Sequence, residues 1–505
     1  MRLLLVFAAA ALLYLPTARY GFVQDDRAII AANPAAHSIA AALGAFDAPY
    51  WPPPSEGGLY RPLTILSYAI DWTLSGGRPG WFHIVNALWH GLVAVLVVLV
   101  VARWLPRMAA VAAGLVFALH PVHVEGVANV VSRAELLATV GILSAVLGAR
   151  RGRWAAAVAC AALAMLSKER GVAAGVLILL DDWLQGPTGR RYPVRLYVAL
   201  AIVTGVFLAA WAHVGSQATA DVAPPFLGTG MRERLAMALP ATLRATGLLF
   251  WPANLSADYN PQVIPVRAGF SLPALAGGLL VVGIPALGVW CRRRAPALAF
   301  GALAAAIAYV PTSNLLFASG IVLAERDLYL LVLLPAAMVG HGVTWARARL
   351  SLWLVGPVVA GLALGLALRS FARVPVWRDN RSYLLTLLRD HPESYRAHQS
   401  AAAVLAGVGD TAGARQEYAR ASELFARDPH LDASRAFFLL GLGDTATAQA
   451  LVARARGALP RERVAVRVAF LLALGRGDRA GAEALADTAE RWFPWEAGWY
   501  RQHLQ

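Results

Sequence analysis

Two adjacent carboxylates near the N-terminus are the first residues in this chain that could do chemistry. Asp25 and Asp26 follow an apolar stretch and come directly before Arg27. A carboxylate can accept a proton from an attacking hydroxyl group, acting as a general base, or it can bind a divalent metal ion. The pair could instead lie in a solvated acidic loop or cap a helix that begins at Arg27, so its role depends on its surroundings.

A second polar group ends another apolar stretch. His120, His123 and Glu125 form an H-x-x-H-x-E run. Imidazole and carboxylate groups bind metal ions, and they also form hydrogen bonds with the polar groups of substrates. Pro121 disfavours a regular helix with both histidines on one face, so the run favours substrate contact over a metal site. A structural role, in which His120 and Pro121 end the helix, is the other alternative.

Further polar residues place cations beside carboxylates at the ends of apolar stretches. Arginine and lysine are suited to binding phosphate groups. The same side chains could instead form ion pairs within a helix bundle, and one network can do both. We include them all among the expected substrate-binding residues. They are Arg133 and Glu135, Lys168, Glu169 and Arg170, Glu325 and Arg326 beside Asp327, and Asp258 in the stretch LSADYNP.

The composition indicates which kind of protein must position these residues. Of 505 residues, 58% are hydrophobic and only 15% are charged, compared with roughly 25% charged residues in soluble domains. The mean hydropathy is +0.55, and these values together indicate a membrane protein. The net charge of +15 does not indicate binding to nucleic acid, because most basic residues flank apolar stretches, where membrane topology explains them.

The apolar stretches predict about eleven membrane spans, each of which needs roughly 20 residues. Basic residues gather in short cytoplasmic loops. This rule is met if the N-terminus is inside and the stretch 235–251, with Pro240 and Arg244, lies in the interface as an amphipathic helix. We expect the first stretch to be a retained helix rather than a cleaved signal peptide. The spans begin near residues 2, 81, 108, 134, 153, 171, 194, 270, 296, 328 and 351, and the basic inner loops hold Arg103 and Arg107, Arg150, Arg151 and Arg153, Arg190, Arg191 and Arg195, Arg292–Arg294, and Arg347 and Arg349.

This topology puts the polar motifs together on the outer side of the membrane. Polar residues at membrane depth are costly and tend to line sites or cavities. The long first outer loop, 18–80, also contains an aromatic and Pro-rich stretch whose second half, 62–74, is predicted to be an amphipathic helix. Anchoring at the interface does not explain its Arg61 and Asp71. The motif stretches are 22–34, 120–135, 166–171, 255–261 and 311–329.

The chain becomes polar near residue 373, where a second domain is predicted to begin. Gly-Asp recurs at 409–410, 443–444 and 477–478, so that 34 residues separate each Asp from the next. This is the period of tetratricopeptide repeats. We therefore predict an α-helical membrane domain over 1–372 and a soluble tetratricopeptide-repeat α-solenoid over 373–505, with each Gly-Asp in the turn between two paired helices.

Several long stretches, in this order and followed by repeats, resemble one family. The chain is similar to the transmembrane and tetratricopeptide-repeat-containing O-mannosyltransferases and their bacterial relatives, within the GT-C glycosyltransferases. The similarity covers most of the chain, which has about three to four repeats, fewer than many relatives. The matching stretches are QDDRAIIAANP (24–34), YRPLTILSYAIDWTLSGGRPGWFHIVNALWH (60–90), FALHPVHVEGVANVVSRAELLA (117–138), LSKERG (166–171) and SNLLFASGIVLAERDLYL (313–330).

The resemblance implies a polytopic GT-C-type bundle that transfers a sugar, mannose, with inversion from a polyprenyl-phosphate donor to an acceptor hydroxyl group. It implies that Asp25 or Asp26 occupies the catalytic acidic position, and that the repeats receive or position a protein or glycan acceptor. The chemistry of the residues agrees, because cations stabilise a leaving phosphate and one carboxylate can deprotonate the hydroxyl. The choice between the two aspartates stays open, as does assistance by a divalent metal.

Two other functions compete with this interpretation. A transporter of lipid-linked sugars would place its polar site near the membrane midplane, whereas these motifs gather on one side. A membrane-anchored scaffold would use the repeats to bind peptides, which leaves the motifs of the membrane half unexplained. Lys168 is the only lysine in a chain rich in Ala, Arg and Gly. That composition is typical of high-GC bacteria, so we expect an inner-membrane protein with its repeats in the periplasm.

Overall fold

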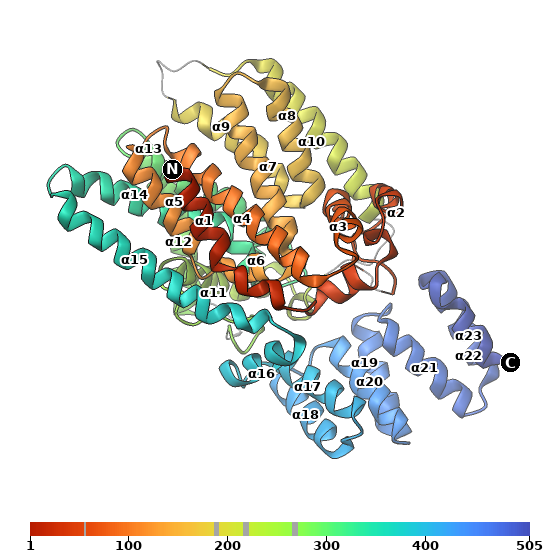
Figure 1. The fold of residues 1–505 in the computed structure, drawn as a ribbon. Coiled ribbons are helices and arrows are strands. Elements are labelled where there is room, and N and C mark those ends of the chain that lie inside the picture. Colours follow the sequence, from red (N-terminus) through yellow and green to blue (C-terminus); the bar gives the residue numbers. More distant parts are fainter. Residues whose placement is uncertain (55–56, 186–190, 216–221, 265–270) are drawn as a thin grey trace.

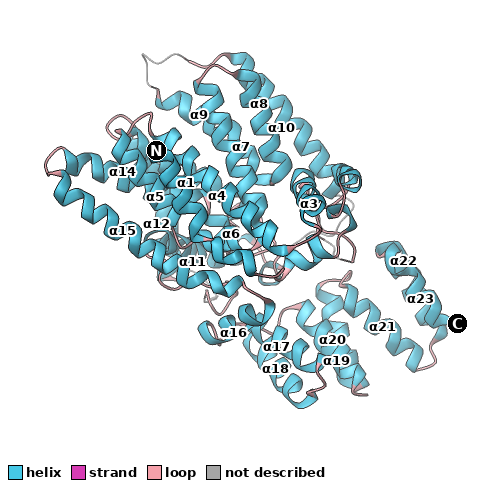
Figure 2. Cartoon of the chain, in the orientation of Figure 1, coloured by secondary structure: helices cyan, strands magenta, loops and turns pink. Residues whose placement is uncertain are grey.

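The computed structural model is a bundle of α-helices joined by short turns and loops, with a second group of helices beside one end of the bundle (Figures 1 and 2). It describes residues 1–54, 57–185, 191–215, 222–264 and 271–505, so Arg190 lies outside the described residues. The bundle contains α1 (Arg2–Leu13), α2 (Ile39–Ala42), α3 (Pro62–Ser75), α4 (Pro79–Val101), α5 (Arg107–Leu119), α6 (His123–Ala128), α7 (Arg133–Arg150), α8 (Trp154–Ser167), α9 (Ala173–Leu184), α10 (Val194–Gly215), α11 (Met231–Phe250), α12 (Leu272–Cys291), α13 (Pro296–Tyr309), α14 (Leu333–Arg347) and α15 (Leu352–Arg373).

Six helical segments among the described residues are long and apolar enough to cross a membrane, and four shorter apolar helices accompany them. The chain is therefore a multi-pass membrane protein. Helices begin at or near the start of every predicted span. That the shorter helices also cross the bilayer stays a prediction. The long segments are Pro79–Val101, Val130–Arg150, Val194–Gly215, Leu272–Cys291, Glu325–Arg347 and Leu352–Trp377, and the shorter ones are Arg2–Leu13, Arg107–Leu119, Trp154–Ser167 and Pro296–Thr312.

Basic loops that were predicted to share one side of the membrane lie at one end of the bundle, here called the basic end. Arg150, at the end of α7, forms an ion pair of 2.6 Å with Asp181 of α9 and donates a 2.6 Å hydrogen bond to the carbonyl of Val100 in α4. Arg292, after α12, lies over the Trp183 ring, 5.0 Å from its centre. These contacts join the ends of four helices through the basic residues.

Helix α11 contains the stretch that was predicted to lie in the membrane interface. Near its start, Arg234 donates a 3.0 Å hydrogen bond to the carbonyl of Leu316, and near its end the Leu249 carbonyl accepts one of 3.0 Å from His120. Both partners belong to the predicted outer motifs, so the two ends of α11 meet the same end of the bundle, here called the motif end. This arrangement agrees with a helix that lies across the bundle rather than through it.

The first outer loop contains the predicted amphipathic helix as α3. The predicted range of 62–74 and the observed Pro62–Ser75 differ by one residue. Proline at the first helical position favours this start, and Gly76, with a φ of 66°, ends the helix in a left-handed conformation that glycine adopts without strain. Tyr68 of α3 packs against Phe82 of α4, which ties the loop to the bundle.

Paired helices follow α15, and the predicted Gly-Asp turns lie between them. Gly409, Gly443 and Gly477 have φ values of 85°, 80° and 74°. The following aspartates cap the next helix, each accepting a hydrogen bond from a backbone N–H three residues further on, as N-cap residues do. The helices are α16 (Asn380–Asp390), α17 (Tyr395–Gly407), α18 (Thr411–Leu424), α19 (Pro429–Gly441), α20 (Thr445–Ala458), α21 (Arg463–Gly475), α22 (Arg479–Trp492) and α23 (Ala497–Leu504).

The first paired helices contact the loops at the motif end. The Gln24 N–H donates a 2.8 Å hydrogen bond to the Asn380 side chain at the start of α16. Asn260 donates one of 2.7 Å to the Ser394 hydroxyl, just before α17. The polar motifs therefore lie between the membrane bundle and the paired helices.

Candidate active site

A cavity of about 990 Å³ lies at the motif end and is lined by residues from all five predicted motif stretches. Its charged lining residues are five cations and five carboxylates among the described residues. The polar wall thus has no net charge before a ligand binds. The residues are Arg61, Lys168, Arg170, Arg326 and Arg396, with Asp25, Glu135, Glu169, Asp258 and Asp327.

The two adjacent aspartates occupy different environments. Asp25 is partly exposed and lines the cavity. Asp26 is fully buried, and its two oxygens accept backbone hydrogen bonds of 3.0 Å from Val23 and 2.8 Å from Val131. Asp26 therefore holds the first outer loop against the turn before α7, while Asp25 is the carboxylate that faces the cavity.

The residue before this pair has a strained backbone. Gln24 has a φ of 51°, a left-handed conformation that is uncommon for residues other than glycine. The hydrogen bonds from Gln24 to Asn380 and from the Gly21 N–H to the Arg378 carbonyl, at 3.1 Å, hold this turn in place. Strained backbone often occurs at functional sites, where the surrounding structure maintains it. Here the Gln24 conformation sets the direction in which the Asp25 side chain projects from the backbone.

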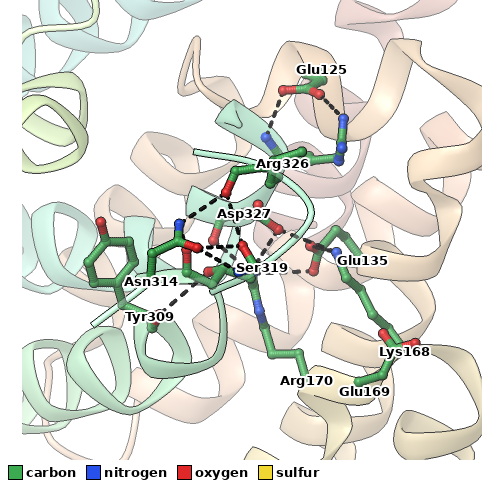
Figure 3. A network of polar contacts seen from close by, with 12 residues as sticks. Glu125, Glu135, Lys168, Glu169, Arg170, Tyr309, Asn314, Ser319, Arg326 and Asp327 are labelled. Carbon is green, nitrogen blue, oxygen red and sulfur yellow. Dashed lines mark hydrogen bonds and ion pairs between the residues drawn. The ribbon is translucent and has the colours of Figure 1, made fainter. Parts of the chain in front are cut away.

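A ring of buried ion pairs forms the cavity wall next to the membrane bundle (Figure 3). Lys168 contacts Glu135 and Asp327, the latter at 3.4 Å. Arg170 pairs with the same two carboxylates, at 3.4 and 3.1 Å, and donates a 2.7 Å hydrogen bond to the Asp327 carbonyl. The pKa of Lys168 is lowered, because the effect of burial exceeds the opposing effect of the nearby Glu135 and Asp327 carboxylates. The ring joins α7, the turn between α8 and α9, and the segment before α14.

Arg326 stands beside this ring but points the other way (Figure 3). Its guanidinium pairs with Glu125 at 2.5 Å, and its backbone N–H donates to the other Glu125 oxygen at 3.0 Å. The Arg326 side chain is 28% exposed, compared with 9% for Lys168 and 2% for Arg170. Of these three cavity-lining cations, Arg326 therefore has the most surface available to a ligand.

Glu169 is not part of the ion-pair ring and instead binds residues of the first outer loop. Its carboxylate accepts hydrogen bonds of 3.0 and 3.1 Å from the Arg61 guanidinium and one of 3.3 Å from the Tyr60 N–H. Arg61 also lies over the Tyr50 ring, 5.0 Å from its centre. These contacts fix the position of the Pro-rich stretch over the cavity.

Arg133 does not line the cavity, although we included it among the substrate-binding residues. It is fully buried and forms a 2.5 Å ion pair with Asp71. It also donates hydrogen bonds of 2.7 Å to the Asn86 side chain and 3.0 Å to the Phe82 carbonyl. Its donors are engaged inside the bundle, so the structure gives Arg133 a structural position.

Both histidines of the H-x-x-H-x-E run are also buried away from the cavity. His120 bonds the Leu249 carbonyl, and burial lowers its pKa to about 4, so the ring is neutral. His123 bonds the Tyr329 carbonyl at 3.0 Å. The structure thus favours the structural alternative for the histidines, while Glu125 acts by holding Arg326. In the described part of the chain, no group of three or more His, Cys, Asp or Glu side chains is placed to hold a metal ion.

Glu325 organises the stretch that contains Asp258. Its carboxylate accepts hydrogen bonds of 2.7 Å from the Ser256 N–H and 2.9 Å from the Tyr259 hydroxyl. Asp258 itself lines the cavity and accepts a 2.9 Å hydrogen bond from Asn260. Glu325 is therefore a positioning residue, and Asp258 belongs to the cavity wall facing the paired helices.

The paired helices supply cavity residues that the sequence analysis missed. Arg396 of α17 lies 4.0 Å from Asp258, and its side chain is 40% exposed. Trp377, Tyr383 and Tyr395 line the same wall. No local pattern marks these residues as part of a site, since each lies in ordinary helical sequence. Their role follows from the packing of α16 and α17 against the outer loops.

Asn314 shapes the long loop before the ring. It has a φ of 58°, which asparagine tolerates better than most residues. Its side chain donates to the Ile321 carbonyl at 3.0 Å and accepts from the Ser319 N–H at 2.7 Å and the Ser319 hydroxyl at 2.9 Å. These bonds close the loop 314–321 into a compact lobe on the cavity rim.

No protein-family model matches the chain, but individual proteins are similar to it. It is 27% identical to protein O-mannosyl-transferase Tmtc1 of Drosophila melanogaster, over 76% of this chain and 57% of that protein. It is 30% identical to Drosophila Tmtc2, over 61% and 34%, and 28% identical to F38B6.6 of Caenorhabditis elegans, over 84% and 62%. Both of these are also protein O-mannosyl-transferases by name.

The chain is a distant homologue of the protein O-mannosyl-transferases. It spans between 34% and 62% of the length of these three relatives. Among solved structures, it is similar to ArnT from Cupriavidus metallidurans bound to undecaprenyl phosphate, with a TM-score of 0.42 and 14% identity over 97% of this chain and 80% of that one. This second likeness is weak and supports no conclusion about the ligands of this chain.

Asp26 makes the stability of the chain depend on pH. Burial raises the pKa of its carboxyl group from 3.8 to about 7, against the hydrogen bonds from Val23 and Val131, which lower it. Because the folded chain binds this proton more tightly than the unfolded chain, the stabilisation is fully present below about pH 4 and is lost as the pH rises through about 7. The apparent melting temperature of the wild-type chain, relative to Asp26→Asn, is therefore expected to fall between about pH 5 and about pH 8.

Thermal unfolding of the full chain in detergent, followed by circular dichroism, measures this difference. Asp47→Asn is the matched control, because Asp47 lies in the same loop with an 83% exposed side chain, and an exposed pair such as the one it forms with His213 contributes little to stability. It should keep the pH dependence of the wild type. A difference in melting temperature between the wild type and Asp26→Asn that stays constant with pH would contradict the role assigned to the buried carboxyl group.

Proposed function

We propose that this chain is a membrane glycosyltransferase of the GT-C type, which moves mannose from a polyprenyl-phosphate donor to a hydroxyl group of a protein. The observation that carries the proposal is that Asp25 and Arg326 line the same cavity at the motif end. Homology to protein O-mannosyl-transferases supports the reaction class. The name of those relatives supports mannose as the sugar and a protein as the acceptor.

In the proposed reaction, the acceptor oxygen attacks the anomeric carbon of the sugar from the face opposite the phosphate. The bond between that carbon and the phosphate oxygen breaks, and the anomeric centre is inverted. The acceptor proton moves to Asp25, a general base at the cavity surface. The phosphate leaves with its charge stabilised by the fork of donors on the Arg326 guanidinium.

Arg326 suits the phosphate better than the other cations of the motif stretches. Lys168 and Arg170 are committed to Glu135 and Asp327, and removing them from these partners would leave buried carboxylates without compensation, which costs about 3–5 kcal/mol. Arg326 has one carboxylate partner in Glu125, and its side chain is partly exposed. Arg396, which lines the same cavity beside Asp258, is a second cation available to the donor.

The arrangement of the chain supports further parts of the proposal. We assign residues 1–372 to the glycosyltransferase domain and residues 373–505 to a tetratricopeptide-repeat solenoid, whose 34-residue period coincides with the observed helix pairs. The motif end is assigned to the periplasmic side of a bacterial inner membrane, because the basic end carries the residues typical of cytoplasmic loops. A transporter would instead place its polar site near the midplane.

Asp25→Asn should abolish most of the transfer activity. The amide cannot accept the proton, and loss of a general base lowers rates by about 10²–10⁴-fold. The measurement is transfer of labelled mannose from polyprenyl-phosphate mannose to protein acceptors by the purified chain. Asp47→Asn is again the control and should keep the wild-type rate. If Asp25→Asn folds and transfers mannose at the wild-type rate, the assignment of the base is wrong.

Arg326→Gln should lower kcat by roughly 10²–10³-fold, the usual effect of removing one donor to a developing negative charge. Arg326→Lys should recover only part of this loss, since lysine keeps the charge but not the fork of donors. Arg420→Gln, an exposed change in α18, serves as the control. The melting temperature of each variant shows whether a lower kcat comes only from destabilisation after loss of the Arg326–Glu125 ion pair. A folded Arg326→Gln variant with normal kcat would remove Arg326 from the proposed leaving-group site.

A further inference from the structure

A second cavity, of about 470 Å³, lies between the first outer loop and the last helices of the chain. One wall comes from residues between 33 and 53 of the loop, from Gly57, and from Ile65 of the following helix. The other comes from Arg461, before α21, and from Trp492, Phe493 and Trp495, at the junction of α22 and α23. Segments far apart in the sequence thus enclose one space, which is separate from the cavity lined by Asp25 and Arg326, here called the reaction cavity.

Trp51 lies between the two cavities, because it lines both of them. Its position is closely fixed. Tyr50 anchors the preceding backbone through a 2.6 Å hydrogen bond from its N–H to the Leu59 carbonyl. Gly57 lies so close to the indole that a Cβ there would be 2.3 Å from the Trp51 ring. A ligand in the second cavity therefore meets the reaction cavity at an indole ring that packs against Gly57.

The lining of the second cavity is apolar, and its polar side chains mostly donate hydrogen bonds. Among the described lining residues there is no carboxylate and no hydroxyl group. The polar side chains are Asn33, the three tryptophans and Arg461. Indole and guanidinium groups are donors only, and the Asn33 oxygen already accepts a 3.0 Å hydrogen bond from the Ala35 N–H. Most of the remaining lining residues are prolines, alanines and glycines, together with Ile65 and Phe493.

We propose that this cavity binds an extended, proline-containing segment of the acceptor polypeptide and delivers the adjoining Ser or Thr past Trp51 to Asp25. The inference rests on the proposed function, because it names the acceptor site of that reaction. An extended segment with prolines presents carbonyl groups and few N–H groups, and aromatic-lined grooves bind such segments. Side chains that only donate hydrogen bonds match a ligand that mainly accepts them.

Other ligands fit this lining less well. A glycan acceptor has many hydroxyl groups that donate hydrogen bonds, but the described lining side chains offer only the Asn33 oxygen, which already accepts from the Ala35 N–H. Backbone carbonyls would have to accept the rest, and each buried hydroxyl left without a partner costs about 1–3 kcal/mol. A polyprenyl chain has no polar groups for the donors of Arg461 and the indoles. Arg461, whose guanidinium lies over the Trp492 ring at 5.5 Å from its centre, adds a positive charge that favours neutral or acidic segments.

The test uses the full-length chain with two variants of the distal wall, Trp495→Ala and Arg461→Ala. Phe437→Ala, an exposed apolar side chain on α19 that lines neither cavity, is the matched control. The probes are synthetic peptides that carry one Thr beside a proline-containing apolar flank, and the same peptides with a Gly-Ser flank. Fluorescence anisotropy measures binding without catalysis, and mannose transfer measures KM for each peptide. Hydrolysis of polyprenyl-phosphate mannose by water measures donor use.

We expect each distal-wall variant to weaken binding and raise KM for the proline-containing peptide on the order of tenfold, the effect of losing an aromatic or arginine contact. Donor hydrolysis and the Phe437→Ala variant should match the wild type. Unchanged peptide binding in both variants overturns the inference. A rise in KM for the lipid donor alone also overturns it, as does an oligosaccharide that displaces the peptide from the wild-type chain. If the wild type uses no lipid-linked mannose at all, the proposed function fails, while anisotropy still decides whether the cavity binds the peptide.

Discussion

The buried ring of Lys168, Glu135, Arg170 and Asp327 is the constraint on which the motif end depends. Two cations and two carboxylates lie almost out of contact with water, so each needs the others. Removing one partner from such a group is destabilising by about 3–5 kcal/mol. The ring therefore fixes the three segments that carry it, and it explains why these cations stand at the end of the bundle opposite the basic loops.

The ring's two cations and two carboxylates neutralise one another, and we propose that residues beside the ring carry the chemistry. Arg326 has its own partner, Glu125, and keeps part of its surface in the cavity. Asp25 reaches the same cavity from the first outer loop, held there by Asp26 and by the contact of Gln24 with Asn380. The paired helices thus help to position the candidate base, and Arg396 of α17 lines the same cavity. The membrane bundle and the helices after α15 build one site together.

Local signals allowed much of the fold to be predicted. Apolar length placed the membrane helices, proline and glycine bounded α3, and the Gly-Asp period located the helix pairs, since each feature depends on neighbouring residues. The roles of individual side chains depend on distant partners. Arg133 and Lys168 both follow apolar stretches, yet Arg133 pairs with Asp71 inside the bundle, whereas Lys168 pairs with Glu135 and Asp327 at the cavity wall. Likewise, Asp25 and Asp26 are distinguished by two backbone N–H groups, and nothing in the sequence around Arg396 points to the cavity.

The most direct test of a single lipid-phosphate sugar site at the motif end is an experimental structure with a donor analogue. The full chain would be reconstituted in lipid nanodiscs with a non-hydrolysable polyprenyl phosphonate of mannose and imaged by electron cryomicroscopy. We expect the phosphonate oxygens within hydrogen-bonding distance of the Arg326 guanidinium and the sugar in the cavity that Asp25 lines. A sugar bound near the membrane midplane, or outside this cavity, would contradict the account.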